Sequence, residues 1–188
     1  MNLKNKNIII TGASKGIGKS ITEEFILQGA NVIINYKSDK SSAEKLEDFA
    51  YKNGVKVLIV QADITNPKEI EIMFNKITKK FPRIDVLVNN AGIFNEKDSP
   101  KNLEVFKSIF ETNFLSHIRI TNETLKYMEK GKIIFISSIH GKLGQGRPDA
   151  IAYSSMKAAL NSYMKNLAKY LAPKILVNAV APGQTLTP

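Results

Sequence analysis

The chain has 188 residues, of which 43% are hydrophobic and 23% charged, a composition typical of an ordinary globular protein with one sizeable core. It contains no cysteine, which excludes disulfides, thiolate metal sites and cysteine nucleophiles. The only two histidines, His117 and His140, lie far apart in sequence and give little support for a metal site. We therefore expect a single domain over residues 1–188 and no metal.

The formal net charge of +10 raises the question of a nucleic-acid partner. The basic residues are spread along the whole chain, and only three of the 27 are arginine. Proteins that read nucleic acids usually cluster basic residues on one face and use arginine for base contacts. A lysine-rich solvated surface is therefore favoured over a nucleic-acid site, while attraction to an acidic partner or a phosphorylated ligand stays open.

The first residues are polar and lead into a very short apolar run, Ile8 to Ile10. That run is shorter than the apolar core of a signal peptide, and no apolar segment is long enough to span a bilayer. We expect a cytoplasmic protein without a membrane partner.

Short apolar runs alternate with helical patterns along the whole chain. Six strands are predicted: Asn7–Thr11, Asn31–Tyr36, Val55–Gln61, Ile84–Asn89, Lys132–Ser138 and Ile175–Ala179. Several are nearly continuous Ile, Val and Leu, as strands buried on both faces of a parallel sheet require. The alternation predicts right-handed crossovers and an α/β fold of three layers around a doubly wound parallel sheet.

The predicted helices carry apolar residues three or four positions apart. The clearest stripe consists of Ile70, Met73, Phe74, Ile77 and Phe81. Its start is marked by Asn66 as the N-cap, Pro67 at the first helical position and Glu69 as a capping-box acid. The last helix is predicted to run from Ile151 to about Leu171.

A glycine-rich turn, Thr11-Gly12-Ala13-Ser14-Lys15-Gly16-Ile17-Gly18, follows the first predicted strand and precedes a helix. Glycines let the backbone turn tightly and approach a pyrophosphate, which then sits at the positive helix N-terminus. Many loops contain three glycines, but the place between a first strand and a first helix strengthens the indication. No Gly-Lys-Ser/Thr follows at the spacing of a Walker A loop.

Tyr153 and Lys157 lie four residues apart at the start of the last predicted helix. Residues at this spacing share one helix face, with Cβ atoms about 5–6 Å apart. A neighbouring ammonium stabilises a phenolate and so makes a phenol a better proton donor near neutral pH. Taken alone, the pair also fits an ordinary amphipathic surface.

Four further features occur in a fixed order. Asn89-Asn90-Ala91-Gly92 ends the fourth strand, Asn113 interrupts a long helical pattern, Ser137-Ser138 closes the fifth strand and Pro182-Gly183 follows the sixth. Each alone also fits a turn, a cap or a helix irregularity.

Together with the glycine turn and the Tyr–Lys pair, these features resemble the short-chain dehydrogenase/reductase family in its single-domain branch, whose glycine signature is T-G-x-x-x-G-x-G. The runs I-T-G-A-S-K-G-I-G, V-I-I-N-Y and V-N-A-V-A-P-G are most similar to the 3-oxoacyl-[acyl-carrier-protein] reductase group. The resemblance implies a Rossmann fold and an oxidoreductase that transfers hydride between a nicotinamide and a carbonyl or secondary alcohol.

The resemblance implies a catalytic tetrad of Asn113, Ser138, Tyr153 and Lys157. Tyr153 would protonate the carbonyl oxygen, and Ser138 would hydrogen-bond and position that oxygen. Lys157 would assist Tyr153 and hold the nicotinamide ribose, and Asn113 would anchor a water that connects Lys157 to solvent.

Cofactor preference depends on the end of the second strand, where an acid favours NAD and a cation favours the 2′-phosphate of NADP. Lys37 follows this strand and Lys15 lies in the glycine turn, so NADP(H) is favoured over NAD(H), although Asp39 lies nearby. By family position Asp63 would contact the adenine, Asn89, Ala91 and Gly92 would line the adenosine side, and Thr187 would meet the carboxamide. The complete implied cofactor set is Gly12, Ser14, Lys15, Gly16, Ile17, Gly18, Lys37, Asp63, Asn89, Ala91, Gly92, Tyr153, Lys157, Pro182, Gly183 and Thr187.

The resemblance favours reduction of 3-oxoacyl thioesters on an acyl carrier protein in fatty acid synthesis. Sugar and secondary-alcohol dehydrogenases share every motif quoted, and a non-catalytic nucleotide-binding protein or fragment is a further alternative. The resemblance implies that the helix over residues 151–171 pairs with its copy in a homodimer or homotetramer, while ordinary packing of this helix against the sheet is the alternative. The segment 139–152 is slightly longer than in acyl-carrier reductases. Because family members normally continue beyond Pro188 with lid helices and a seventh strand, we expect the chain to be truncated there.

Overall fold

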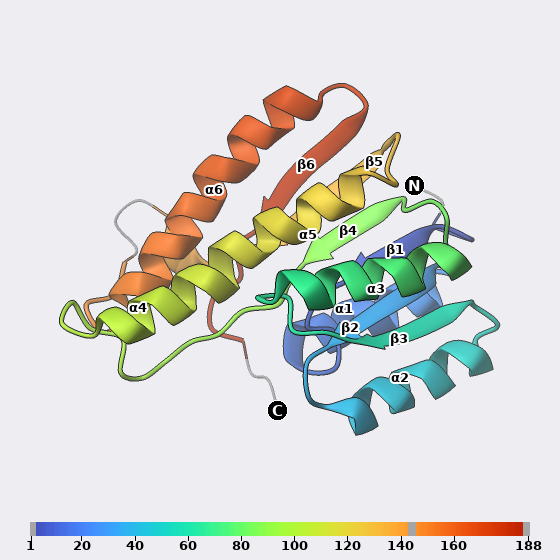
Figure 1. The fold of residues 1–188 in the computed structure, drawn as a ribbon, viewed down its shortest axis with the longest axis horizontal. Helices are drawn as coiled ribbons and strands as arrows, with labels where there is room; N and C mark the ends of the chain where they lie inside the picture. Colours follow the sequence, from blue (N-terminus) through green and yellow to red (C-terminus); the bar gives the residue numbers. More distant parts are fainter. Residues whose placement is uncertain (1–2, 143–145, 186–188) are drawn as a thin grey trace.

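A six-stranded sheet forms the centre of the computed structural model, which describes residues 3–142 and 146–185 (Figure 1). Neighbouring strands are all parallel, in the order β3-β2-β1-β4-β5-β6. The strands are β1 (Asn7–Ile10), β2 (Asn31–Tyr36), β3 (Val57–Gln61), β4 (Val86–Asn89), β5 (Gly131–Ile136) and β6 (Ile175–Val180). The order runs outward in both directions from β1 and β4, which confirms the predicted doubly wound sheet.

Helices cover both faces of this sheet, which gives the three predicted layers (Figure 1). One face packs against α1 (Gly16–Leu27) and α2 (Lys40–Lys52). The other packs against α3 (Pro67–Lys80), α5 (Ser116–Leu125) and α6 (Ile151–Leu171). A shorter helix, α4 (Leu103–Phe110), continues through a π-helical turn, η1 (Glu111–Leu115), into α5, and a 3₁₀ turn, η2 (Ile139–Gly141), follows β5.

The continuous apolar runs of the sequence explain why the strands are buried on both faces. Ile8, Ile9 and Ile10 of β1 are all 0% exposed. Because side chains alternate along a strand, Ile9 enters the core under α3, α5 and α6, whereas Ile8 and Ile10 enter the core under α1 and α2.

Strand boundaries differ from the predicted ones by one or two residues, except for β2. The N–H of Val55 donates to Ala50 of α2 and the N–H of Ile84 donates to Tyr127, so both bond outside the sheet. The third and fourth strands therefore begin two residues later than their apolar runs suggest.

The start of α3 shows the predicted N-cap with a different role for its acid. The Asn66 side chain accepts from the N–H of Lys68 at 3.0 Å, and Pro67 is the first helical residue. The Glu69 carboxylate accepts from the side chain of Asn66 at 3.0 Å and from the N–H of Asp63 at 2.7 Å. Glu69 therefore fixes the loop after β3, which carries Asp63.

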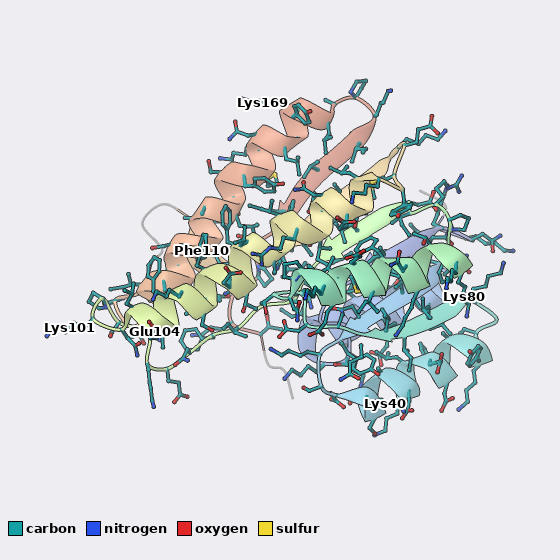
Figure 2. The ribbon with its side chains drawn as sticks, viewed as in Figure 1. Lys40, Lys80, Lys101, Glu104, Phe110 and Lys169 are labelled. Atoms are coloured by element: carbon teal, nitrogen blue, oxygen red, sulfur yellow. The ribbon has the colours of Figure 1, made fainter. Side chains whose placement is uncertain are left out.

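The surface carries its lysines on many elements. Lys40, Lys80, Lys101 and Lys169 lie at widely separated places around the molecule, near the ends of three helices and in the loop before α4 (Figure 2). Within the described ranges, none of the helices is both long and apolar enough to cross a membrane.

Candidate active site

Two adjoining cavities lie at the carboxyl ends of the strands, where the strand order reverses. The larger, of about 620 Å³, is lined by the segments that follow β1, β2, β3 and β4. The smaller, of about 270 Å³, is lined by segments that follow β4, β5 and β6 and by the first turns of α6. Ile17, Asn90, Gly92 and Ile93 line both cavities, so the two form one groove. Open α/β sheets bind ligands in this crevice.

The glycine turn after β1 forms one wall of the larger cavity. Gly12 and Gly16 have φ values of +60° and +53°, a conformation that glycine adopts without steric cost. A Cβ atom at Gly18 would lie 2.4 Å from the Gly12 carbonyl oxygen and 2.5 Å from Nδ2 of Asn90. The start of α1 therefore packs against the turn more closely than any side chain would allow.

Hydrogen bonds from neighbouring strands hold this turn in place. The Asn90 side chain donates to the carbonyl oxygens of Thr11 at 2.9 Å and Gly12 at 3.0 Å. The Thr11 hydroxyl accepts from the N–H groups of Asn90 and Ala91, and the Asn35 side chain accepts from the N–H of Gly12. Sequence reasoning selected neither Asn90, Thr11 nor Asn35 as site residues, although polar residues at the ends of buried strands are the signal that could have found them.

Asn89, expected to line the adenosine side, lies elsewhere. Its side chain is 0% exposed and donates to the Thr121 hydroxyl at 3.0 Å on α5. Of the two neighbouring asparagines, Asn90 lines both described cavities and Asn89 lines neither. Successive side chains of a strand point to opposite faces, so only one member of the pair can face the groove.

Charged side chains gather at the far end of the larger cavity. Nζ of Lys37, with its side chain 72% exposed, lies 2.6 Å from Oδ2 of Asp63. Burial opposes the charge of Asp63, but Lys37 and the hydrogen bonds from Thr65 hold the pKa of this carboxyl below its ordinary value. Asp39 is the N-cap of α2 and accepts from the N–H of Ser42 at 3.0 Å. This bond, with help from Lys15, keeps the pKa of Asp39 low.

The groove brings together most of the residues that the sequence analysis selected as site residues. Those in the larger cavity are Gly12, Ser14, Lys15, Gly16, Ile17, Gly18, Lys37, Asp63, Ala91 and Gly92. Those in the smaller cavity are Ser138, Tyr153, Lys157, Pro182 and Gly183. Thr187 lies outside the described residues.

Lys157 is buried beside Tyr153 in the smaller cavity. It is 3% exposed, and its Nζ donates to the carbonyl oxygen of Ile136 at 2.7 Å. The same Nζ lies 5.6 Å from the centre of the Tyr153 ring. Burial lowers the pKa of Lys157 to about 8, because desolvation disfavours the ammonium form. An ammonium with such a pKa can exchange its proton near neutral pH.

Ser138 reaches the same cavity from the end of β5. Its Oγ accepts from the N–H of His140 at 3.2 Å, which caps η2. A Cβ atom at Gly141 would lie 2.6 Å from the carbonyl carbon of Lys157, so η2 packs directly on α6. This close packing fixes the Ser138 segment relative to the helix that carries Tyr153 and Lys157.

Asn113 lies in the π-helical turn η1 and is 0% exposed. Its Oδ1 accepts from the N–H of Ile93, and its Nδ2 donates to the carbonyl oxygen of Ile93, both at 2.8 Å. Asn113 thus clamps a residue that lines both cavities, while lining neither of the two described cavities itself. Single π-helical turns often occur at functional sites.

Comparison with known proteins identifies this arrangement. A family model described as short chain dehydrogenase matches residues 6–188. The chain belongs to this family. Among curated relatives, glucose 1-dehydrogenase 2 of Bacillus subtilis is 35% identical over 98% of this chain and 74% of its own length. The 3-oxoacyl-[acyl-carrier-protein] reductase of Escherichia coli is 36% identical over 97% of this chain and 75% of its own length.

A solved short chain dehydrogenase from Burkholderia cenocepacia, in complex with NADP, is also similar. It superposes with a TM-score of 0.91 at 30% identity, covering 100% of this chain and 77% of its own. These findings confirm the resemblance to a family of NAD(P)-dependent oxidoreductases. The chain spans from 66% to 75% of the length of the curated relatives it matches.

This short-chain dehydrogenase carries a buried histidine that sequence reasoning treated only as a poor metal candidate. His117 of α5 is 0% exposed, and its Nε2 donates to the carbonyl oxygen of Ala91 at 2.7 Å. Its Nδ1 has no hydrogen-bond partner in the part of the chain that the structure describes. Burial, and to a lesser extent the charge of Lys157, lowers the pKa of His117 to about 3. The ring therefore supports the Asn90–Gly92 segment as a neutral group.

Proposed function

We propose that the chain is an NADP(H)-dependent carbonyl reductase that acts on 3-oxoacyl thioesters, with residues 1–188 forming one dinucleotide-binding domain. The observation that carries the proposal is the placing of Ser138, Tyr153 and Lys157 around one cavity that adjoins the glycine turn. The glycine turn, with Gly12 and Gly16 at positive φ directly before the N-terminus of α1, suits a pyrophosphate, so these residues fit a dinucleotide. The bound nicotinamide would supply the hydride.

The tetrad residues would act as follows. Tyr153 gives its phenolic proton to the carbonyl oxygen of the substrate, and Ser138 donates a hydrogen bond to the same oxygen. Lys157 stabilises the phenolate that forms and returns a proton to it, which its lowered pKa near 8 makes feasible. The Asn113 side chain makes both of its hydrogen bonds to Ile93, so a water anchored by Asn113 would bind to the main chain of this residue.

The charges at the far end of the larger cavity support NADP(H) over NAD(H). Lys15 and Lys37 both line this cavity, and the Lys37 side chain is 72% exposed. Asp39 directs one carboxylate oxygen to the first turn of α2. Lys15 is thus available to a 2′-phosphate, Lys37 would exchange its partner Asp63 for it, and Asp39, the acid that follows β2, is engaged as a cap.

The wall beside Tyr153 supports an acyl substrate. Ile93 and Phe94 line the smaller cavity, and the Phe94 ring meets the Tyr153 ring edge-on at 5.6 Å between centroids. An apolar wall next to the proton donor suits a hydrocarbon chain better than a polyhydroxylated one. The 36% identity to the Escherichia coli reductase agrees with this choice.

Family members are often oligomeric, and we propose a homodimer or homotetramer built on α6.

The decisive test is turnover by the purified protein. With NADPH and a 3-oxoacyl thioester of a short thiol, we expect loss of NADPH absorbance and formation of the 3-hydroxyacyl product by mass spectrometry. Acyl-carrier-linked substrate should be turned over faster if the carrier docks on this chain.

The competing function is oxidation of a sugar or a simple secondary alcohol. The 35% identity to a glucose 1-dehydrogenase favours it. Turnover of glucose with NADP, combined with no turnover of the thioester, would transfer the chain to that branch. Tight NADPH binding without turnover of any carbonyl or alcohol would instead support a non-catalytic nucleotide-binding protein.

A further inference from the structure

The first turn of α6 is capped by a side chain from a distant part of the sequence. Oδ1 of Asp98 accepts from the N–H of Ala152, and Oδ2 accepts from the N–H of Tyr153, both at 3.0 Å. The N-cap position of the helix is occupied by Ala150, whose side chain cannot accept a hydrogen bond. The two amides are the second and third of the helix, which an N-cap side chain would normally satisfy. Asp98 therefore supplies the missing cap from the loop between β4 and α4.

This carboxylate is held in a defined place. Asp98 is 4% exposed, and its own N–H donates to the carbonyl oxygen of Asn95 at 3.0 Å. A buried carboxylate requires donors that compensate for the lost water, and two amides at a positive helix end provide them. The contact therefore joins the loop to the helix more firmly than a surface ion pair could.

The segment that ends in Asp98 also touches the side chain of Tyr153. The Phe94 ring lies at 78° to the Tyr153 ring, with 5.6 Å between their centres. At the other end of the segment, both main-chain polar groups of Ile93 are bonded to the Asn113 side chain. Residues 93–98 thus form a brace that begins at Asn113, packs on the Tyr153 ring and ends on the Tyr153 amide.

We propose that Asp98 is a positioning residue for Tyr153: its carboxylate fixes the first turn of α6 so that the phenol reaches the reacting oxygen. The inference rests on the proposed function, because it assumes that Tyr153 is the proton donor. Without the carboxylate, two helix amides lose their partners and the first turn can fray. A displacement of about 1 Å at a proton-transfer group can cost roughly 100-fold in rate.

Lys157 does not depend on this cap. It lies one turn further along α6, and its Nζ is held by the carbonyl oxygen of Ile136 in β5. Removing the Asp98 carboxylate should therefore move Tyr153 relative to Lys157, while the larger cavity that would hold the dinucleotide keeps its walls. A loss of turnover without a loss of cofactor binding is the signature of this arrangement.

The test compares Asp98→Ala and Asp98→Asn with Glu96→Gln. The asparagine keeps one acceptor oxygen and most of the volume, so it should be partly active if the hydrogen bonds matter. Glu96 is an exposed acid two residues away, and its variant removes the same charge from the same loop. For each protein we would measure kcat and KM with a 3-oxoacyl thioester, the Kd for NADPH, the melting temperature, and the amide resonances of Ala152 and Tyr153 by NMR.

We expect kcat to fall about 10- to 100-fold in Asp98→Ala and less in Asp98→Asn, with the NADPH Kd within about twofold of wild type. The amide resonances of Ala152 and Tyr153 should shift upfield and exchange faster in both variants, and Glu96→Gln should match wild type. Unchanged kcat in a folded Asp98→Ala protein, or unchanged amides, overturns the proposal. If Asp98→Ala does not fold, the same criteria apply to Asp98→Asn. A wild-type protein without turnover contradicts the proposed function, and the amide resonances then decide the capping role by themselves.

Discussion

The two ends of the groove differ in the groups that line them, which are main-chain groups at one end and side chains at the other. At the cofactor end, main-chain groups and glycines form the wall, and the position of Gly18 leaves no space for a single added carbon. At the catalytic end, side chains such as Ser138, Tyr153 and Lys157 form the site, and burial lowers the pKa of Lys157. An added side-chain atom should therefore weaken cofactor binding at the cofactor end. At the catalytic end, removal of a polar or titratable group should instead reduce turnover. Predictions that separate the two ends follow from this difference.

The largest effect is expected for Tyr153→Phe. The change removes one hydroxyl from the smaller cavity and leaves the glycine turn untouched. We expect turnover to fall about 1,000-fold or more, because the substrate oxygen would lose the proton donor that we propose for it. The Kd for NADPH, measured by fluorescence titration, should stay within about twofold. An equal loss of binding and turnover would contradict the separation of the two ends.

Gly18→Ala should weaken NADPH binding and lower the stability of the fold, because it changes the cofactor end of the groove. The new Cβ would lie 2.4 Å from a carbonyl oxygen, and the backbone must move to admit it. We expect destabilisation of about 1–3 kcal/mol in urea unfolding, with NADPH affinity at least tenfold weaker. Gly146→Ala is the matched control, because its Cβ would meet only Ser154 at 4.0 Å. Equal behaviour of the two variants would show that the turn can relax.

His117→Gln tests the buried ring through the pH dependence of stability. The pKa of His117 is lowered to about 3 in the folded state, whereas an unfolded histidine has a pKa of about 6.5. Below about pH 6.5 the unfolded chain binds a proton on His117 that the folded chain does not bind, so the free energy of unfolding falls as the pH drops. Glutamine can still donate to Ala91 but does not titrate. Between pH 7 and pH 5 the free energy of unfolding should therefore fall by about 2 kcal/mol less in the variant than in wild type. Parallel curves in urea unfolding would refute a neutral buried ring.

The smallest effect is expected at the entrance to the cofactor end. Lys15→Ala removes a cation from the cavity wall, so the preference for NADPH over NADH should fall about tenfold in the ratio of kcat/KM. Lys19→Ala is the control, since Lys19 pairs with Glu23 on α1. A ratio that does not change in Lys15→Ala would leave Lys37 as the cation that selects the phosphate.

The sequence predicted the elements that repeat a simple rule. Continuous apolar runs such as Ile8–Ile10 identified strands buried on both faces, and the helix predicted from Ile151 to about Leu171 has these bounds in the structure. The glycine turn was found for the same reason, because its residues are consecutive and their spacing has a steric cause.

The sequence could not predict contacts that depend on the closed fold. Asp98 caps a helix that begins more than fifty residues later, and nothing near Asp98 in sequence indicates this partner. The choice between Asn89 and Asn90 depends on which face of β4 each side chain takes. The neighbours of His117 come from the segment after β4 and from β5, so the local sequence around His117 does not reveal that it is buried. Local patterns fix elements, whereas pairings between elements require their arrangement in space.

The π-helical turn η1 sets the phase between two helices with different partners. α4 packs on α6, while α5 packs on β4 and α3. A π-helical turn takes up about one residue more than an α-helical turn, so η1 absorbs an extra residue while α4 and α5 keep the faces that meet their separate partners. Without this turn the extra residue would rotate α5 relative to α4 by about 100°, and either α4 would leave α6 or His117 and Thr121 would leave the sheet. A change in the length of this helix therefore has to be absorbed by such a turn, whereas substitutions that keep the turn leave both packing faces in place.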